Sequence, residues 1–212
     1  NKKYELVKDD FIIHEGRKLY RIKAVVDIEN VFAVLKTTKG ELGGYVEGYH
    51  NLSQEGKCWI FGDAKVYGNA RVKDNAVIEN RAKVYGNVIV KDNAEVSDSA
   101  EIYGNVMIED IACIRENAKV FGNARVRDCA KVSENAEVFG NARINGNARV
   151  YDEAKVFGNA LVKDNSIVYD SAKVFGNAEI SEKAEVKEVA KVHSNTKVDG
   201  HSVVHGLEFL LT

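Results

Sequence analysis

The chain has 212 residues, of which 45% are hydrophobic and 29% charged, and its formal net charge at pH 7 is −2. This composition is typical of a globular protein, and the near-neutral charge gives no general attraction to nucleic acid or to an anionic membrane. No apolar run is long enough to span a membrane and no signal-peptide core is present, so the expected location is the cytoplasm. Cys58, Cys113 and Cys129 lack the spacing of disulfides or metal ligands, which fits a reducing compartment.

Residues 1–57 follow no short repeat and are predicted to form a small β-rich cap. Apolar residues in 11–14 and 18–25, joined by Glu15 and Gly16, predict a β-hairpin. Residues 31–35 predict a further strand or a short helix, and residues 37–44 a turn-rich loop. We expect a cap here because the repeat that follows would otherwise end in open strand edges.

A six-residue unit repeats without interruption through residues 58–206. Every sixth residue from Ile60 to Val204 is Val or Ile, and every sixth residue from Cys58 to Ser202 is Ala or, in a few repeats, Cys, Val, Ser or Thr. Polar residues alternate with these two positions, as in a short strand with one buried face. Gly, Asp, Asn, Glu or Ser then opens a turn, and Gly and Asn tolerate the positive φ of a sharp bend. The pattern predicts a solenoid in which each coil hydrogen-bonds to its neighbours.

A second period of eighteen residues indicates how many hexads make one coil. Aromatic residues, and finally a histidine, recur at this spacing in the ring column, which comprises Tyr67, Tyr85, Tyr103, Phe121, Phe139, Phe157, Phe175 and His193. Three hexads per coil stack these residues on one side, whereas two or four would not. The sequence therefore predicts a triangular prism of about eight coils. The apolar tail at 207–212 is predicted to close the last coil or to dock on another subunit.

The repeat also resembles a known family. Its aliphatic first residue and small fifth residue resemble the hexapeptide repeat of left-handed parallel β-helices. The Gly-Asn-Ala coils, preceded by the Gly-Gly-Tyr-Val-Glu and Asn-Leu-Ser-Gln-Glu-Gly strings at 43–47 and 51–56, resemble the bacterial and phage-encoded YdcK-like proteins. The resemblance implies an all-β fold, with a left-handed β-helix over residues 58–206. Such proteins are labelled acyltransferases on fold alone, and only that alternative implies acyl-CoA; no cofactor is expected otherwise.

The ring column lies beside a row of mostly basic residues, each two positions before a ring. The row is Lys65, Lys83, Glu101, Lys119, Glu137, Lys155, Lys173 and Lys191. Because a monomer seldom leaves so long an apolar strip in water, we interpret the column as an interface between identical subunits, in a trimer or a dimer. The alternative is a platform on which a glycan or another planar small molecule stacks. The two glutamates and the net charge argue against nucleic acid.

An asparagine column runs parallel to the rings and is predicted to be structural. Asparagine suits a turn with positive φ, and stacked asparagine amides hydrogen-bond along a ladder. The column comprises Asn69, Asn87, Asn105, Asn123, Asn141, Asn159, Asn177 and Asn195.

The five histidines are the remaining candidates for chemistry, and they are His14, His50, His193, His201 and His205. The β-helical acyltransferases use a histidine as general base near a cleft between subunits, often with a loop that leaves the helix. The unbroken hexads leave no room for such a loop, and the last three histidines fall on three different sides, so no metal site is expected.

We therefore assign no catalytic residue and predict a non-enzymatic structural or binding protein that acts through the ring column. An acyltransferase using acyl-CoA is the alternative. A second alternative is a sponge that sequesters a small nucleotide or metabolite between subunits.

Overall fold

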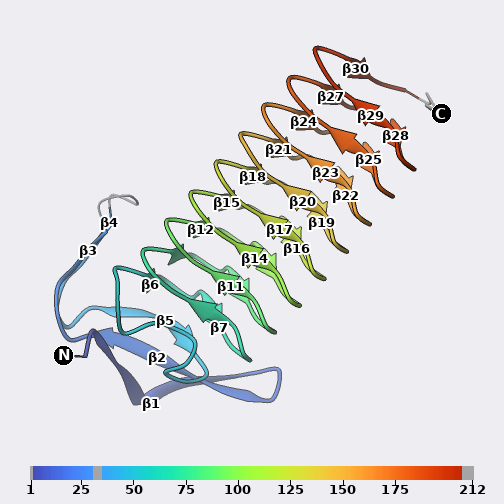
Figure 1. Cartoon of the computed structure of the whole chain (residues 1–212). Helices are drawn as coiled ribbons and strands as arrows, with labels where there is room; N and C mark the ends of the chain where they lie inside the picture. Colours follow the sequence, from blue (N-terminus) through green and yellow to red (C-terminus); the bar gives the residue numbers. More distant parts are fainter. Residues whose placement is uncertain (1, 31–34, 207–212) are drawn as a thin grey trace.

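The computed structural model describes residues 2–30 and 35–206, and these residues form β-strands and turns without a helix (Figure 1). The predicted all-β, parallel β-helical fold with eighteen-residue coils is confirmed. No helix in the described part of the chain could cross a membrane. The predictions for 31–34 and for the tail at 207–212 lie outside the described residues.

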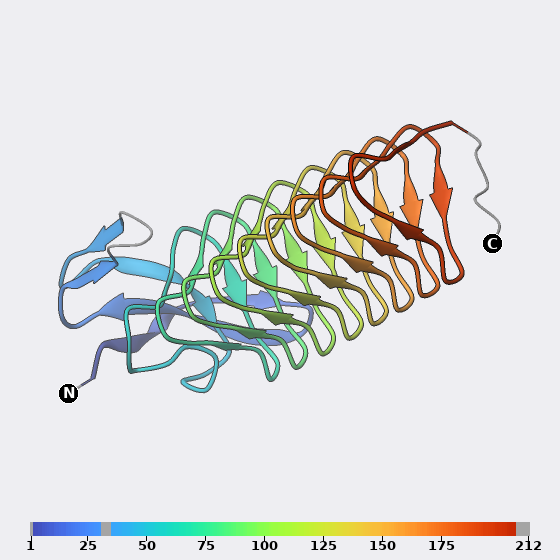
Figure 2. The same cartoon turned by 45° about the horizontal axis from the view of Figure 1, so that its top comes forward.

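Three parallel sheets form the faces of a long prism whose coils follow one another along a single axis (Figure 2). The first face contains β7 (Lys65–Val66), β10 (Lys83–Val84), β13 (Glu101–Ile102), β16 (Lys119–Val120), β19 (Glu137–Val138), β22 (Lys155–Val156), β25 (Lys173–Val174) and β28 (Lys191–Val192). The second face contains β8 (Arg71–Val72), β11 (Ile89–Val90), β14 (Met107–Ile108), β17 (Arg125–Val126), β20 (Arg143–Ile144), β23 (Leu161–Val162), β26 (Glu179–Ile180) and β29 (Lys197–Val198). The third face contains β6 (Trp59–Ile60), β9 (Val77–Ile78), β12 (Glu95–Val96), β15 (Cys113–Ile114), β18 (Lys131–Val132), β21 (Arg149–Val150), β24 (Ile167–Val168), β27 (Glu185–Val186) and β30 (Val203–Val204).

The hexad explains both the core and the corners of the prism. The small and aliphatic positions point inward and are almost all fully buried, as at Ala136 and Val138. The first turn residue has positive φ at every corner from Gly62 to Gly206, as the composition of that position predicts. At two of the three corners this residue is usually acidic, and its carboxylate accepts the backbone N–H one coil further on; Asp110 Oδ2 lies 3.1 Å from Asp128 N. The acidic residues are therefore part of the ladder that holds successive coils together.

The cap begins with the predicted hairpin, which is confirmed. Strands β1 (Tyr4–His14) and β2 (Arg17–Ala24) pair antiparallel through a turn at Glu15 and Gly16, whose φ values are 50° and 74°. The pairing shifts register between Val7 and Phe11, which leaves a charged bulge of Lys8, Asp9 and Asp10 on the outer strand. A charged bulge on an edge strand discourages pairing with another chain. A smaller ribbon of β3 (Ile28–Asn30) and β4 (Leu35–Thr37) completes the cap.

The loop predicted for 37–44 is wrong in its second half, because Gly43 and Gly44 belong to strand β5 (Leu42–Val46). A Cβ atom at Gly44 would lie 2.4 Å from Ile60 Cγ2 and 2.5 Å from the backbone oxygen of Ala64. These glycines therefore allow a close backbone approach rather than a turn. Strand β5 pairs antiparallel with β2 and parallel with β7, so it joins the cap to the first face and extends the parallel stacking ahead of the hexads.

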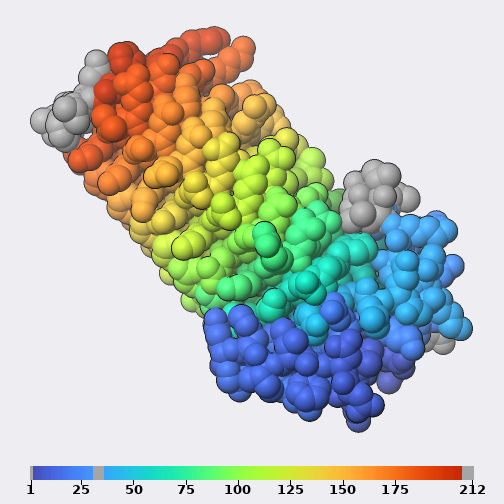
Figure 3. Space-filling view, turned by 180° about the vertical axis from the view of Figure 1, so that it is seen from behind, coloured from blue at the N-terminus to red at the C-terminus, as the bar shows by residue number. Residues whose placement is uncertain are grey.

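A buried lysine closes the open end of the prism. Lys3 is only 5% exposed, and its Nζ donates to the backbone oxygens of Glu55 (3.2 Å) and Cys58 (2.9 Å) and to Cys58 Sγ (3.2 Å). Burial lowers the pKa of the Lys3 ammonium and raises the pKa of the Cys58 thiol. Cys58 is fully buried, as its place among the small residues predicts. The space-filling view shows the cap lying across this end of the prism (Figure 3).

Candidate binding face

The ring column forms one continuous stack along the corner between the first and second faces. Each ring follows a strand of the first face, and successive centroids lie 4.8 to 5.2 Å apart. Neighbouring Tyr and Phe rings are within 8° of parallel, and His193 stacks on Phe175 at 24°. The spacing equals that of neighbouring strands, so the backbone ladder dictates the ring stack.

Stacking leaves mainly ring edges at the surface. The face of each inner ring is covered by the rings before and after it, and the rings from Tyr85 to His193 are half-buried. Tyr67 differs because it is only 2% exposed. The column is thus a narrow ridge of apolar edges, and its inner rings offer no open face to a planar ligand.

The asparagine column forms the predicted ladder beside the rings. Each amide Nδ2 donates to the Oδ1 of the asparagine one coil further on, at 2.8 to 3.1 Å, from Asn69 to Asn195. These bonds occupy the side-chain oxygens from Asn87 onward, which supports the structural interpretation of the column.

The charged row on the first face is partly neutralised within the chain. Lys155 Nζ lies 3.2 Å from Glu137 Oε2, and the Tyr85 hydroxyl donates to Glu101 Oε1 at 2.9 Å. Burial, followed by this hydrogen bond, raises the pKa of Tyr85. Burial also lowers the pKa of the Lys65 ammonium. The row therefore presents lysines around two acidic positions, Glu101 and Glu137, and both glutamates are engaged by side chains of neighbouring coils.

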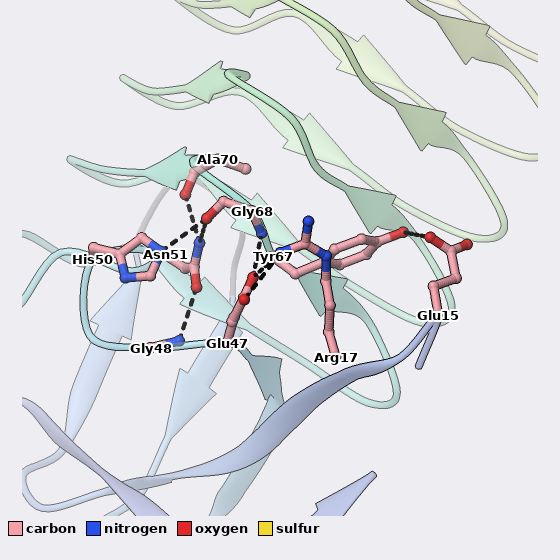
Figure 4. Close-up of polar contacts among 9 residues, drawn as sticks. All are labelled: Glu15, Arg17, Glu47, Gly48, His50, Asn51, Tyr67, Gly68 and Ala70. Carbon is pink, nitrogen blue, oxygen red and sulfur yellow. Dashed lines mark hydrogen bonds and ion pairs between the residues drawn. The ribbon is translucent and has the colours of Figure 1, made fainter. Parts of the chain in front are cut away.

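A polar network fastens the cap to the first corner of the ring column (Figure 4). Glu47 accepts from the Gly68 backbone N–H at 2.7 Å and from Arg17 Nη1 at 3.0 Å. Asn51 Nδ2 donates to the backbone oxygens of Gly68 (3.0 Å) and Ala70 (2.9 Å). His50 Nε2 lies 2.8 Å from the same Gly68 oxygen. His50 is therefore a structural contact of the cap.

The tip of the β1–β2 hairpin covers the N-terminal end of the ring column. The Tyr67 hydroxyl donates to Glu15 Oε2 at 3.3 Å, and the His14 ring meets Tyr67 edge-on with centroids 5.3 Å apart. Leu19 packs with Tyr67 in a small apolar cluster to which Ile12 adds. The protein thus covers the beginning of the column with its own β-strands. Tyr85 still packs against this cluster, while the rings from Tyr103 onward lack such a cover among the described residues.

The covered end is expected to be sensitive to pH through His14. Burial is the main cause that lowers the pKa of His14; Lys65 and Lys83 act in the same direction, while Glu15 and Glu101 oppose them. The folded chain therefore favours neutral His14. As pH falls below the ordinary histidine pKa of about 6.5, His14 is protonated in the unfolded chain before it is protonated in the folded chain. The free energy of unfolding therefore decreases with falling pH, and it stops decreasing once the pH is below the lowered pKa of folded His14.

We expect the urea midpoint of the parent protein to be lower at pH 5.5 than at pH 7.5. Fluorescence of Trp59, the single tryptophan, reports this transition because it is buried against Tyr4 in the cap. His14→Phe keeps an edge-on ring and is expected to reduce the pH dependence. If the urea midpoint of this variant keeps the pH dependence of the parent protein, titratable groups other than His14 cause that dependence.

The other histidines do not form a common site. His193, His201 and His205 follow β28, β29 and β30, which belong to three different sheets, as predicted. Within residues 2–30 and 35–206, no three His, Cys, Asp or Glu side chains gather as metal ligands.

Sequence reasoning missed a shorter stack on the third face. The rings of Tyr151 and Tyr169 lie 5.2 Å apart at 14°, and the Tyr169 hydroxyl donates to Glu185 at 3.2 Å. Their separation of eighteen residues was a sufficient signal, because any two side chains at that spacing are stacked neighbours. The pair serves below as an internal control for the ring column.

A family model described as the YdcK beta solenoid repeat matches residues 64–80. The match covers β7, β8 and β9, which together make one coil with one strand on each face. The same pattern of inward and outward residues recurs in the later coils. No curated protein matches the chain.

Proposed function

Since one coil of this β-solenoid matches the YdcK repeat, we propose that the chain is a non-enzymatic structural and binding module that self-associates through the ring column. The observation that carries the proposal is the stack of rings from Tyr85 to His193, whose edges line one corner over on the order of 30 Å. Apolar strips of this length are typical of surfaces that another protein covers.

The cap indicates what kind of partner fits the column. Strands β1 and β2 cover Tyr67 with aliphatic side chains and an edge-on ring, and they leave it 2% exposed. Flat strands are thus a suitable cover for ring edges at this spacing. A second copy of the chain offers the same kind of surface, since the first face is itself a flat sheet beside the column.

The charged row favours a two-fold dimer over a trimer with parallel axes. With parallel axes, coils of equal height meet, so a row lying on the three-fold axis would meet its own copies and like charges would face each other. About a two-fold axis between β16 and β19, Lys119 would face Glu137 of the second copy, and Glu101 would face Lys155. Only the outer positions, Lys83 with Lys173 and Lys65 with Lys191, would bring like charges together. Opposite charges at the centre of an interface fix its register.

A platform for sugar rings is less well supported by the same geometry. Sugar recognition by stacking requires an open aromatic face, and the faces of the inner rings are covered at 4.8 to 5.2 Å. Ring edges packed against a protein surface do not need that opening.

The test replaces one ring in the middle of the column and one ring outside it. Phe139→Lys places a charge at the centre of the proposed interface, and Tyr169→Lys removes a stacked ring from the third face. The solution mass is measured by light scattering, and circular dichroism verifies the fold of each variant.

We expect the parent protein and Tyr169→Lys to be dimers and Phe139→Lys to be a monomer. If Phe139→Lys keeps the parent mass while remaining folded, the ring column is not the interface.

A further inference from the structure

The second face carries a group of arginines that the coil architecture does not need. Arg125 and Arg143 are cross-strand neighbours on β17 and β20, so two guanidinium groups stand one coil apart in the same outward row. Arg127 follows β17 on the same side. Like charges placed directly opposite each other destabilise a sheet.

In two other places on this side of the prism, lysines are paired with glutamates of the next coil. Lys91 lies 2.9 Å from Glu109, and Lys163 lies 2.8 Å from Glu179. Among the described residues, by contrast, Arg125 and Arg143 have no ion pair within 4.0 Å, and Arg127 reaches only its neighbour Asp128, at 4.0 Å. The three exposed guanidinium groups thus form a local positive charge in a chain whose net charge is −2.

These side chains line a groove of about 480 Å³, which also includes Asn123, Asn141 and Glu109. The ladder bonds of Asn123 and Asn141 use one of the two hydrogens on each Nδ2, so the second can donate to a ligand. The carboxylate of Glu109 is held by Lys91, which offsets its charge. The groove therefore combines planar cationic donors with neutral amide donors.

We propose that this groove binds a small ligand through a tetrahedral oxyanion, that is, a phosphoryl or sulfo group. Neighbouring coils place Arg125 and Arg143 about 4.8 Å apart at their backbones, which lets one such group accept hydrogen bonds from both. Guanidinium forks match the oxygens of phosphate better than lysine does. The arginines lie on a different face from β7–β28, while Asn123 and Asn141 adjoin the ring column at the shared corner. The proposed contacts to the ligand come from one chain and do not depend on self-association.

The test uses inorganic phosphate, inorganic sulfate and acetate as probes at constant ionic strength. NMR titration follows the arginine Nε–H signals of the parent, Arg143→Gln and Arg71→Gln. Arg71 is the matched control because it occupies the same outward row of the second face, but its neighbour in the next coil is Ile89.

We expect saturable binding of phosphate or sulfate by the parent and by Arg71→Gln, with shifts at Arg125, Arg127 and Arg143. Arg143→Gln should bind about tenfold more weakly or worse, because it loses a charge-assisted pair of hydrogen bonds. Binding of phosphate but not of sulfate would indicate a phosphorylated ligand. Binding of sulfate but not of phosphate would indicate a sulfated ligand.

A thermal measurement separates binding from folding. Without the probe, the Tm of Arg143→Gln should equal or exceed that of the parent, because a repulsive pair is removed. Equal affinities of all three proteins, binding of acetate as tight as that of phosphate, or no saturable binding by the parent would each overturn the proposal.

Discussion

Gly44→Ala is expected to unfold the cap at a much lower denaturant concentration than the parent protein. The added Cβ would overlap Ile60 Cγ2 at 2.4 Å and the backbone oxygen of Ala64 at 2.5 Å. A side-chain methyl and a backbone oxygen cannot both move away within a paired sheet, so we expect a loss of about 3 kcal/mol. Urea unfolding followed by Trp59 fluorescence measures this loss.

Gly48→Ala is the matched control for this prediction. A Cβ at Gly48 would approach only the side chain of His50, at 2.9 Å. That exposed ring can move aside at the cost of its single contact with the Gly68 oxygen, which is a smaller loss than a clash with backbone. Neither Gly44 nor Gly48 has positive φ, so the comparison isolates crowding from backbone strain. Coinciding unfolding curves for the two variants would show that β5 does not pack against the first coil as closely as described.

Ala136→Val is expected to destabilise the prism itself by about 1–3 kcal/mol, the usual cost of added methyl groups in a packed core. Ala136 is fully buried, and every member of its column from Ala64 to Ala190 is alanine. In solenoids, each coil is stabilised by its neighbours, so a misfit in the middle weakens the coils on both sides. Urea unfolding followed by far-ultraviolet circular dichroism measures the effect.

Ala124→Val provides the control in a different column. Val88 and Val106 already occupy this column, and both are buried. The core therefore already accommodates a valine one coil away from Ala124, at Val106. We expect Ala124→Val to lower the free energy of unfolding by less than about 1 kcal/mol. Equal losses for Ala124→Val and Ala136→Val would mean that these two small-residue columns are equivalent.

The prism could be predicted from the sequence because its contacts have a constant separation. Side chains that touch along the axis are eighteen residues apart, as in the asparagine ladder from Asn69 to Asn195. A single chain therefore repeats the same contact many times, and the period reveals coil size, faces, corners and ring stack together. Even the overlooked pair of Tyr151 and Tyr169 follows this rule.

The cap could be predicted only in part, because its contacts follow no period. The turn at Glu15 and Gly16 is local and was predictable from residue type. Lys3 instead reaches Cys58 over 55 residues, and Gly44 is needed because Ile60 and Ala64 approach it from the first coil. Nothing in the neighbouring sequence marks such residues as junction contacts.

The two proposed surfaces differ in the same way. The ring column repeats in every coil and is therefore conspicuous in the sequence. Arg125 and Arg143 are also eighteen residues apart, so their pairing was predictable, but the outward positions of the second face vary from coil to coil and do not single this pair out. The structure adds that both side chains line one groove together with Arg127.

The most direct test of self-association through the ring column is the solution mass of the unmodified protein, measured by native mass spectrometry. One chain weighs 23.4 kDa. The two-fold arrangement, with Lys119 facing Glu137 of the second copy, predicts twice this mass. A single species at 23.4 kDa would contradict the assignment of the ring column as an interface, and a trimer would contradict the two-fold register.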